Sequence, residues 1–434
     1  MFITKNDIQI LSAKNANIHD RIALLLCVVI ATTLPFFIQI NSLFVLLLSL
    51  NWLVEGKWKN KWQLFKASPY AILWVGFFAL NALSQLYSNN VKEANFELEK
   101  KLSFMAFPLI FFTSRFITTD RIKLVLKFFV LACSLACAIC FSNAIIHFAQ
   151  GDRSYLFYHQ LASPLGFHAV YFSMYVGFCL FMVLFDAFAN WASIRKTQKL
   201  LYVCVLVFFF LFLVLLSSKT MLVSTVAIIA LKFTFGYVEN KMRAFSVLAV
   251  AAVALSIIIT KAPYISDRFN EIFQENYAEV LTRTDYQNFH FTGGTIRLAI
   301  WRSVFEVLDQ QNAWLFGVGI GDAQDLLTAN YNLKHIYPGD AVLGFKGFTH
   351  YNAHNQYLQF LLSTGIIGLL LFVILLVYAF VKSWQTKNSL LLSILFLFCS
   401  FCFTESVLSS HKGVVFFLFF SSLLLQQTQT KETN

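Results

Sequence analysis

Charged residues are scarce in this chain of 434 residues: Asp, Glu, Lys and Arg make up 13%, while 58% of the residues are hydrophobic. A soluble domain has about 25% charged and roughly 45–50% apolar residues, so the composition excludes an ordinary soluble protein. Long apolar runs such as "LLYVCVLVFFFLFLVLLSS", at 200–218, approach the length of about 20 residues that crosses a bilayer. Backbone groups in lipid must be hydrogen-bonded within their own segment. We therefore expect an all-α protein with many membrane spans.

The apolar runs predict about twelve transmembrane helices and one large loop. The expected spans are 21–40, 41–55, 69–88, 103–119, 124–148, 165–190, 200–217, 221–235, 244–260, 356–381, 389–404 and 414–426. The chain then divides into the first nine helices at 1–260, the loop at 261–353, and the last three helices with a tail at 354–434.

Lys and Arg are distributed unequally between the two faces that these spans define. The short loops on the face that holds the N-terminus carry eighteen of them, and those on the opposite face carry six. Cytoplasmic loops are the ones enriched in Lys and Arg, so both termini should be cytoplasmic and the large loop should lie outside the cytoplasm. The net charge of +11 then reflects topology and attraction to anionic lipid. We expect membrane lipid as a partner, and no nucleic acid.

Patterns typical of metal sites and disulfides are lacking as well. All eight cysteines fall in or beside apolar spans, where Cys usually acts as a small hydrophobic side chain. Neither "CSLAC" nor "CSFC" lies in a context that favours a ligand pair. We therefore expect no metal and no cofactor.

The large loop is the longest polar part of the chain, and long loops with structure of their own are usually functional. Apolar residues at helical spacing in "ISDRFNEIFQENYAEVLTR" and "TIRLAIWRSVFEVLDQ" predict two amphipathic helices. "GVGIGD" (317–322) is either a tight turn between helices or a place where backbone amides approach an anionic ligand. "YPGDAVLGFKGFTH" is expected to be a flexible loop that returns to the membrane.

Two cations stand out as candidate ligands for an anion. Lys219 follows Ser218 at the outer tip between two spans, and an ionisable group at membrane depth is by default a functional hypothesis. The alternative is a lysine that extends from a hairpin turn to the membrane surface. Arg297 is predicted to share a helix face with Trp301, where its guanidinium could bind a phosphate through paired hydrogen bonds. The alternative is an exposed charge on an amphipathic helix.

Further polar residues are predicted on the same outer face. His168 and Tyr171 begin the sixth span in "FHAVYFSMY". A belt of interfacial aromatic residues accounts for Tyr171, and His168 is either a headgroup contact or a structural histidine. Glu405 and His411, in "ESVLSSHKG", also face this side. The sequence does not decide whether these two residues join a site.

The stretch "HYNAHNQYLQ" (350–359) places His350 and His354 at the start of the tenth span. Their spacing would suit a metal pair, but no further ligand of a zinc motif lies nearby. A histidine at this membrane edge, near cations that could hold a phosphorylated lipid, suits a general base, because its unperturbed pKa is close to neutral. A structural cap is the alternative reading.

These residues occur in an order that resembles the O-antigen ligase and polymerase superfamily of bacterial inner membranes. The order is "SSK" at a span tip, an Arg-containing helix, "GVGIGD", "HNQYLQ" and "GIIGLLLF", over roughly 200–385. "FHAVYFSMY" is similar to a further segment of that family. The resemblance implies a glycosyltransferase that takes a glycan from undecaprenyl pyrophosphate and joins it to an acceptor hydroxyl in the periplasm. It also implies inversion at the transferred sugar, without metal or nucleotide.

The resemblance also implies roles for individual residues. His354 would be the catalytic base and Arg297 the catalytic cation. Lys219 stands where the family has an arginine, and Lys loses the two-pronged geometry. Substrate contacts are expected from Lys219, Ser218, His168, Tyr171, His350, Asn355 and Tyr357.

The acceptor stays open at this stage. Lipid A–core would make the protein an O-antigen ligase, a second repeat unit would make it a polymerase, and a protein would make it an O-oligosaccharyltransferase. A transporter or flippase predicts repeated halves and charges buried within the spans, and the sequence shows neither. We expect the ligase.

Overall fold

Helices form almost all of the regular secondary structure in the computed structural model, which describes residues 17–232, 277–340 and 345–432 together with Asp7, Ile10, Leu11, Ser266 and Asn270. The helices of the first half are α2 (Ile18–Thr33), α3 (Ile38–Val54), α4 (Trp58–Lys66), α5 (Pro69–Ser84), α6 (Val91–Thr113), α7 (Thr119–Ala149), α8 (Tyr158–Ala162), α9 (Ala169–Asn190), α10 (Lys196–Leu215) and α11 (Lys219–Lys232). They are followed by α14 (Tyr277–Thr282), α15 (Gly293–Gln310), α16 (Ala323–Leu333), α17 (Gln356–Gln385), α18 (Ser389–Cys402) and α19 (His411–Glu432). The expected all-α class is confirmed.

Five of the described helices are long and apolar enough to cross a membrane, or six if the bent pair α3 and α4 is counted as one span. The five are α5 with the short turn after it, α7, α9, α10 and α17. Along α10, Val203, Val207 and Leu211 stay exposed at four-residue spacing, and an exposed apolar face of this kind suits contact with lipid. The expected ninth span, 244–260, lies outside the described residues, and the number of twelve stays a prediction.

The first two expected spans, 21–40 and 41–55, are divided earlier than the sequence predicted. Helix α2 ends at Thr33 and α3 begins at Ile38. Pro35 lies between them, and its nitrogen carries no hydrogen that could continue the helix.

The fourth expected span, 103–119, is also shifted, because α6 covers Val91–Thr113. The side chain of Asn90 caps this helix by accepting the N–H of Glu93. One turn further, Glu97 pairs with Lys101 at 2.5 Å. Charged residues thus extend the helix well before the apolar run that the prediction relied on.

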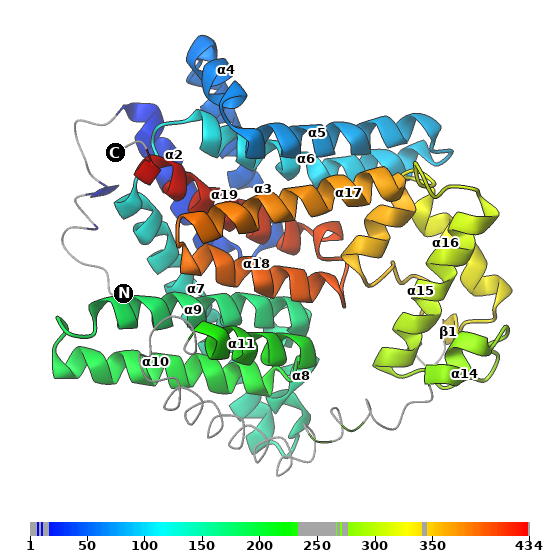
Figure 1. Ribbon diagram of the computed structural model, residues 1–434. Coiled ribbons are helices and arrows are strands. Elements are labelled where there is room, and N and C mark those ends of the chain that lie inside the picture. Colours follow the sequence, from blue (N-terminus) through cyan, green and yellow to red (C-terminus); the bar gives the residue numbers. More distant parts are fainter. Residues whose placement is uncertain are drawn as a thin grey trace.

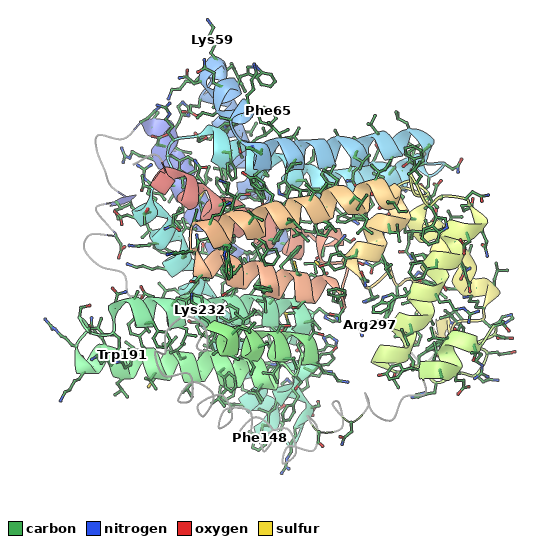
Figure 2. The ribbon with its side chains drawn as sticks, viewed as in Figure 1. Lys59, Phe65, Phe148, Trp191, Lys232 and Arg297 are labelled. Carbon is green, nitrogen blue, oxygen red and sulfur yellow. The ribbon has the colours of Figure 1, made fainter. Side chains whose placement is uncertain are left out.

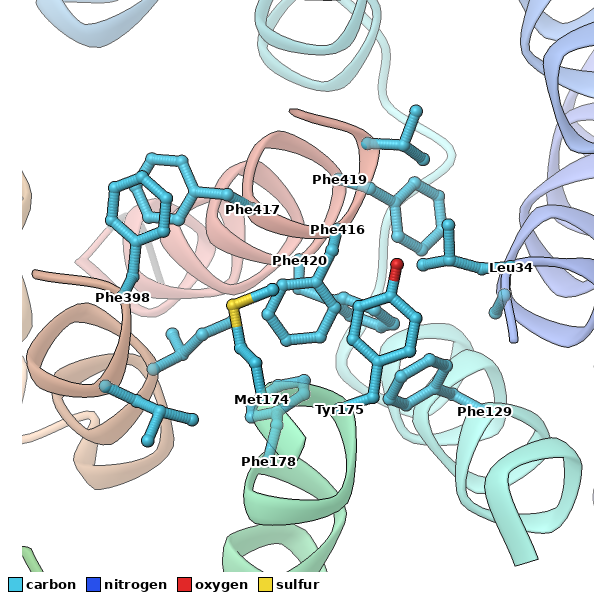
Figure 3. Packing of buried hydrophobic residues seen from close by; sticks show 14 of the residues in the cluster. Leu34, Phe129, Met174, Tyr175, Phe178, Phe398, Phe416, Phe417, Phe419 and Phe420 are labelled. Atoms are coloured by element: carbon cyan, nitrogen blue, oxygen red, sulfur yellow. The ribbon is translucent and has the colours of Figure 1, made fainter. Parts of the chain in front are cut away.

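The centre of the bundle is α19, which packs against α6, α7, α17 and α18. Its residues Val414–Leu425 are buried on every side, as expected for a helix that is apolar all round. Figure 3 shows its phenylalanines against neighbouring helices: Phe416 stacks on Tyr175 of α9, and Phe417 stacks on Phe398 of α18. This core fixes the ends of α9, α18 and α19 relative to one another.

The described part of the large loop folds as a unit with its own core, at one end of the bundle (Figure 1). We call the described residues 277–340 and 345–353 the loop domain. Its core is built on α15 and α16, and it includes Leu361 and Leu362 from the first turns of α17. The expected helix at 295–310 is confirmed as α15. The helix expected at 265–283 lies mostly outside the described residues, and its end is α14.

The segment expected as a flexible loop at 337–350 contains a short ribbon instead. Strands β1 (Gly339–Asp340) and β2 (Phe345–Lys346) pair antiparallel. Just beyond them, the N–H of Phe348 donates to the carbonyl of Tyr337. Gly347 allows this pairing, since a Cβ there would lie 2.0 Å from the backbone of Pro338.

The long helix α17 is interrupted at Gly365, where φ is 67° and ψ is −167°. The turn after α15 fills the interruption with its own backbone. The N–H of Val318 donates to the carbonyl of Leu362 at 2.8 Å. The N–H of Gly319 donates to the carbonyl of Ser363 at 3.1 Å. Carbonyl groups left open by the break are thus satisfied, as a helix in an apolar surrounding requires.

The same turn accounts for the "GVGIGD" motif. On the other side of the break, the N–H of Ile366 donates to the carbonyl of Trp314 at 2.9 Å. Asp322, which ends the motif, accepts the backbone N–H groups of Asn89 and Asn90 before α6. The motif is therefore the tight turn between α15 and α16. The N–H groups of Val318 and Gly319 already donate to carbonyls of α17, so they are not available to bind an anion.

We expect Gly365→Ala to destabilise the protein. A Cβ at this position would lie 2.3 Å from the carbonyl oxygen of Leu315, and the positive φ disfavours any L side chain. The backbone conformation alone should cost about 1–3 kcal/mol, which thermal unfolding in detergent would detect. Gly76→Ala in α5 is the matched control, because no atom lies within 4 Å of its added Cβ. Equal thermal stability of the two variants would contradict the prediction.

Candidate active site

Three segments that are far apart in the sequence meet where the loop domain joins the bundle. Arg297 comes from α15, His354 from the turn before α17, and Glu405 from the loop between α18 and α19. Arg297 Nη2 lies 2.9 Å from Glu405 Oε1, and His354 Nδ1 lies 3.1 Å from Glu405 Oε2. One carboxylate therefore holds the predicted catalytic cation and the predicted base together.

The guanidinium of Arg297 is fixed by three separate contacts. Besides its pair with Glu405, Nε donates to the carbonyl of Thr404 at 3.0 Å, and Nη1 donates to the carbonyl of Gly293 at 2.6 Å. The side chain is still 27% exposed. Figure 2 labels Arg297 beside α15, close to the end of α18. The alternative of a purely solvent-exposed charge is thereby wrong.

Trp301 connects the same helix to the histidine segment. It lies one turn beyond Arg297, and its indole N–H donates to the carbonyl of Ala353 at 3.1 Å. The residue that precedes His354 is thus hydrogen-bonded to α15. Trp301 lies on the Arg297 side of the helix, as predicted. Its hydrogen bond to Ala353 helps to keep the guanidinium of Arg297 and the imidazole of His354 in a fixed relative position.

The backbone at His354 has a φ of 42°, which is uncommon for a residue other than glycine. Its N–H donates to Oδ1 of Asn352, and the imidazole lies against Tyr351 with ring centroids 4.7 Å apart. Non-glycine residues in this region of φ and ψ occur preferentially at functional sites. His354 is 19% exposed on its side chain, so the ring can still be reached.

Asn355 and Tyr357 have structural contacts in this arrangement. The Asn355 side chain caps α17 by accepting the N–H groups of Tyr357 and Leu358. The hydroxyl of Tyr357 donates to the carbonyl of Cys399 in α18 at 3.3 Å. His354 lies just outside the helix, and His350 is exposed in the preceding turn. The two histidines therefore do not form a pair on one helix face.

Glu405 is the residue that the sequence left unassigned. Its side chain is only 6% exposed, and it lies between two groups that can carry positive charge. Burial by itself raises the pKa of this carboxyl, but His354, Arg297 and His168 together bring the pKa below its ordinary value. The group is thus an anion in the folded protein at neutral pH. The available sequence signal was a lone carboxylate in an otherwise uncharged loop, in a chain that is poor in charge.

His168 and Tyr171 lie on the bundle side of the same site. His168 is the residue before α9, and its positive form acts on Glu405 electrostatically. Its ring packs against that of His159 with centroids 4.0 Å apart. The hydroxyl of Tyr171 donates to the carbonyl of Ser406 at 3.5 Å. Both predicted residues therefore border the loop that carries Glu405.

Lys219 and Ser218 mark the start of α11, which packs against α9 and α18. Helices α9 and α11 pack closely at Gly177. A Cβ added to this glycine would lie only 3.1 Å from Oγ1 of Thr225 in α11. The start of α11, the start of α9 and the end of α18 are then at the same end of the bundle. Ser218 is buried and Lys219 is half-buried. Their contact with a substrate stays a prediction.

His411 lies apart from the cluster. Its ring contacts Asn41 and Ser42 of α3, with Nε2 3.3 Å from both Asn41 Oδ1 and Ser42 Oγ. Of the two residues that the sequence left open, the structure brings Glu405 to the predicted site and places His411 against α3.

The chemistry available to this cluster follows from the distances between its ionisable groups. A carboxylate at Nδ1 favours the imidazole tautomer that carries its proton there, which leaves Nε2 free to accept a proton. A neighbouring guanidinium stabilises negative charge that develops on an oxygen. Among the described residues, no group of three or more His, Cys, Asp or Glu side chains is arranged around a common metal position.

Part of the chain matches a known protein family. Residues 204–373 match the family model described as O-antigen ligase, and no curated protein matches the chain. The matched range contains α11, the loop domain and the first part of α17, and therefore Lys219, Arg297 and His354. Glu405 lies beyond it. The segment at residues 204–373 of this membrane protein is therefore a domain of the O-antigen ligase family, whose members are glycosyltransferase-like enzymes.

Proposed function

We propose that this protein is an O-antigen ligase that transfers a glycan from undecaprenyl pyrophosphate to a hydroxyl of lipid A–core at the periplasmic face of a bacterial inner membrane. The observation that carries the proposal is the convergence of Arg297 and His354 on the single carboxylate of Glu405. The family match over residues 204–373 supports the reaction class. The apolar exposed helices support a donor that is delivered within the membrane.

The proposed reaction is a single displacement. The acceptor oxygen attacks the anomeric carbon while its proton passes to Nε2 of His354. The bond between that carbon and the pyrophosphate oxygen breaks, and its electron pair leaves with undecaprenyl pyrophosphate. One displacement inverts the anomeric configuration. Glu405 stabilises the imidazolium that forms, as the carboxylate does in a catalytic triad.

In this proposal, Arg297 and Lys219 provide the positive charge that the departing pyrophosphate requires. Fixed cations aimed at the leaving group stabilise the transition state more than the ground state, which is the condition for catalysis. The two unassigned N–H groups of the Arg297 guanidinium are the ones available to the ligand, since three others donate to Gly293, Thr404 and Glu405. The scheme needs no divalent metal, and persistence of transfer in excess chelator would support it.

Deletion of the gene, followed by gel analysis of lipopolysaccharide, tests the acceptor. A ligase leaves bare core and polymer accumulated on the lipid carrier. Core that bears a single repeat unit would indicate a polymerase, and unchanged lipopolysaccharide with loss of glycan from a protein would indicate an O-oligosaccharyltransferase. Restoration by the wild-type gene, but not by the gene for His354→Ala, would link the phenotype to the proposed site.

Arg297→Lys is expected to lower kcat/KM for the lipid-linked donor about tenfold, and Arg297→Ala should have a larger effect. Lysine keeps the charge but cannot make the three fixed contacts of the guanidinium at once. Steady-state transfer in proteoliposomes, with the donor varied at saturating acceptor, measures the effect. Arg302→Lys is the matched control on the same helix, where Arg302 pairs with Glu306 at 2.8 Å. An equal change in kcat/KM for both variants would mean that Arg297 acts only through the fold.

A further inference from the structure

A cavity of about 620 Å³ opens in the loop domain, beside the start of α15 and the end of α16. Its size falls within the range of about 300–1,000 Å³ that is typical of small-molecule sites. The twelve lining residues come from the segment before α15, from the end of α16 with the turn after it, and from the segment after β2. Their aromatic members are Tyr286, Phe289, Phe291, Tyr337 and Phe348.

The lining combines aromatic rings with amides and contains no Asp, Glu, Lys or Arg. Five of the twelve residues are Tyr or Phe, and three carry a side-chain amide. Tyr337 is 42% exposed, and Phe289 is half-buried, so ring surface is available from solvent. Such a surface suits an uncharged ligand that has flat apolar faces and many hydroxyl groups. A phosphorylated or strongly acidic ligand would find no fixed countercharge among the lining residues.

The cavity walls are held by hydrogen bonds of the loop domain itself. The hydroxyl of Tyr286 donates to the carbonyl of Val280 at 2.7 Å, and its N–H donates to the carbonyl of Lys334 at 2.8 Å. The Arg283 guanidinium lies over the ring of Phe289, 5.1 Å from the centroid. The site is therefore preformed, which lowers the ordering cost of binding.

A chain of aromatic contacts joins the cavity to the catalytic histidine. Phe348 lies 5.7 Å from Phe291 and 5.4 Å from Tyr351, measured between ring centroids. Tyr351 in turn packs against His354 at 4.7 Å. A ligand that occupied the cavity would thus be placed on the side of the loop domain that leads to the reacting groups.

We propose that this cavity binds neutral sugar residues of a glycan substrate, at a distance from the bond that reacts. The inference rests on the proposed transferase function. Two glycans of that reaction share the required chemistry, namely the chain on the carrier and the oligosaccharide of the acceptor. The cavity contributes affinity for the glycan and takes no part in the displacement.

The test uses Tyr337→Ala and Phe289→Ala in the full-length protein, with Phe305→Ala as control. Phe305 is an exposed aromatic residue of α15 that stacks on Trp314 and does not line the cavity. Each cavity variant should raise KM for one glycan substrate about five- to tenfold without changing kcat, as expected when one aromatic contact is lost. A rise in donor KM assigns the cavity to the carrier-linked chain, and a rise in acceptor KM assigns it to the acceptor oligosaccharide. Unchanged KM for both substrates would overturn the proposal.

Direct binding separates this proposal from the proposed function. The probes are the bare core oligosaccharide and the core with O-polysaccharide, both released from host lipopolysaccharide by mild acid, titrated against catalytically inactive His354→Ala. Binding that is weakened by Tyr337→Ala and not by Phe305→Ala supports the cavity site even if the wild type fails to transfer glycan. Absence of binding of either probe, in a wild type that does transfer, refutes the cavity site and leaves the proposed function intact. Tight binding of a peptide in place of both glycans would also refute it.

Discussion

His354→Ala is expected to reduce glycan transfer by about two to four orders of magnitude, the usual contribution of a general base. The variant should insert and fold normally, because the imidazole is partly exposed and its neighbours Asn352 and Asn355 hold the turn through their own side chains. Donor KM should change little, since in the proposed site Arg297 and Lys219 hold the pyrophosphate and His354 does not. The measurement is kcat in proteoliposomes at saturating donor and acceptor.

His19→Ala is the control for loss of an imidazole. His19 contacts Asn51 at 3.0 Å in the α2–α3 hairpin and has no place in the proposed reaction. Full activity of His354→Ala, at the same level in the membrane as the wild type, would remove the assignment of the base. A similar loss of activity in His19→Ala would show that the assay responds to general damage.

Glu405→Gln is expected to lower kcat by at least about tenfold while keeping the size of the side chain. The amide cannot stabilise a positive imidazolium as the carboxylate does. The acidic limb of the pH–rate profile should therefore move to lower pH in the variant. A loss of activity with an unchanged profile would mean that Glu405 holds the loops together without acting on the histidine.

Stability should respond to the same substitution in a pH-dependent way. The pKa of Glu405 in the folded protein lies below its ordinary value of 4.5. A lowered pKa stabilises the fold fully at pH values above the ordinary one, and the stabilisation is lost as the pH falls through the lowered value. Removal of the carboxylate should cost at most about 3 kcal/mol at neutral pH, since Arg297 keeps some contact with water. Thermal unfolding of wild type and variant between neutral and acidic pH measures this difference.

Glu306→Gln provides the matched control for an ion-pair network. Glu306 pairs with Arg302 at 2.8 Å and with Lys334 at 2.5 Å, and burial opposed by these two cations leaves its pKa lowered as well. This substitution should reduce stability without moving the pH–rate profile. The pH–rate profile therefore distinguishes Glu405 from Glu306, whereas thermal unfolding does not.

Much of the helical framework could be predicted, because long apolar runs directly reflect the cost of placing backbone in lipid. The boundaries failed where another rule applied. Pro35 separated α2 from α3, and the Glu97–Lys101 pair extended α6 into charged sequence. Neither the proline break nor the charged extension can be read from the apolar runs alone.

The site was predictable in part for a different reason. Arg297 and His354 lie in recognisable local motifs, so the resemblance assigned them without knowledge of the fold. Glu405 is 108 residues beyond Arg297 and lies in a loop without a motif. Only the packing of α18 and α19 brings its carboxylate to the other two residues, and that packing depends on contacts over the whole bundle.

The interruption of α17 has a consequence for dissecting the protein. A soluble fragment of residues 277–353 would lack Leu361 and Leu362 from its core, and the N–H groups of Val318 and Gly319 would lose their acceptors. The remaining membrane part would leave the carbonyls of Leu362 and Ser363 without their donors, at a cost of several kcal/mol for each such group that water does not reach. The loop domain is thus interlocked with a helix of the bundle, and neither piece should be exchangeable between relatives without the other.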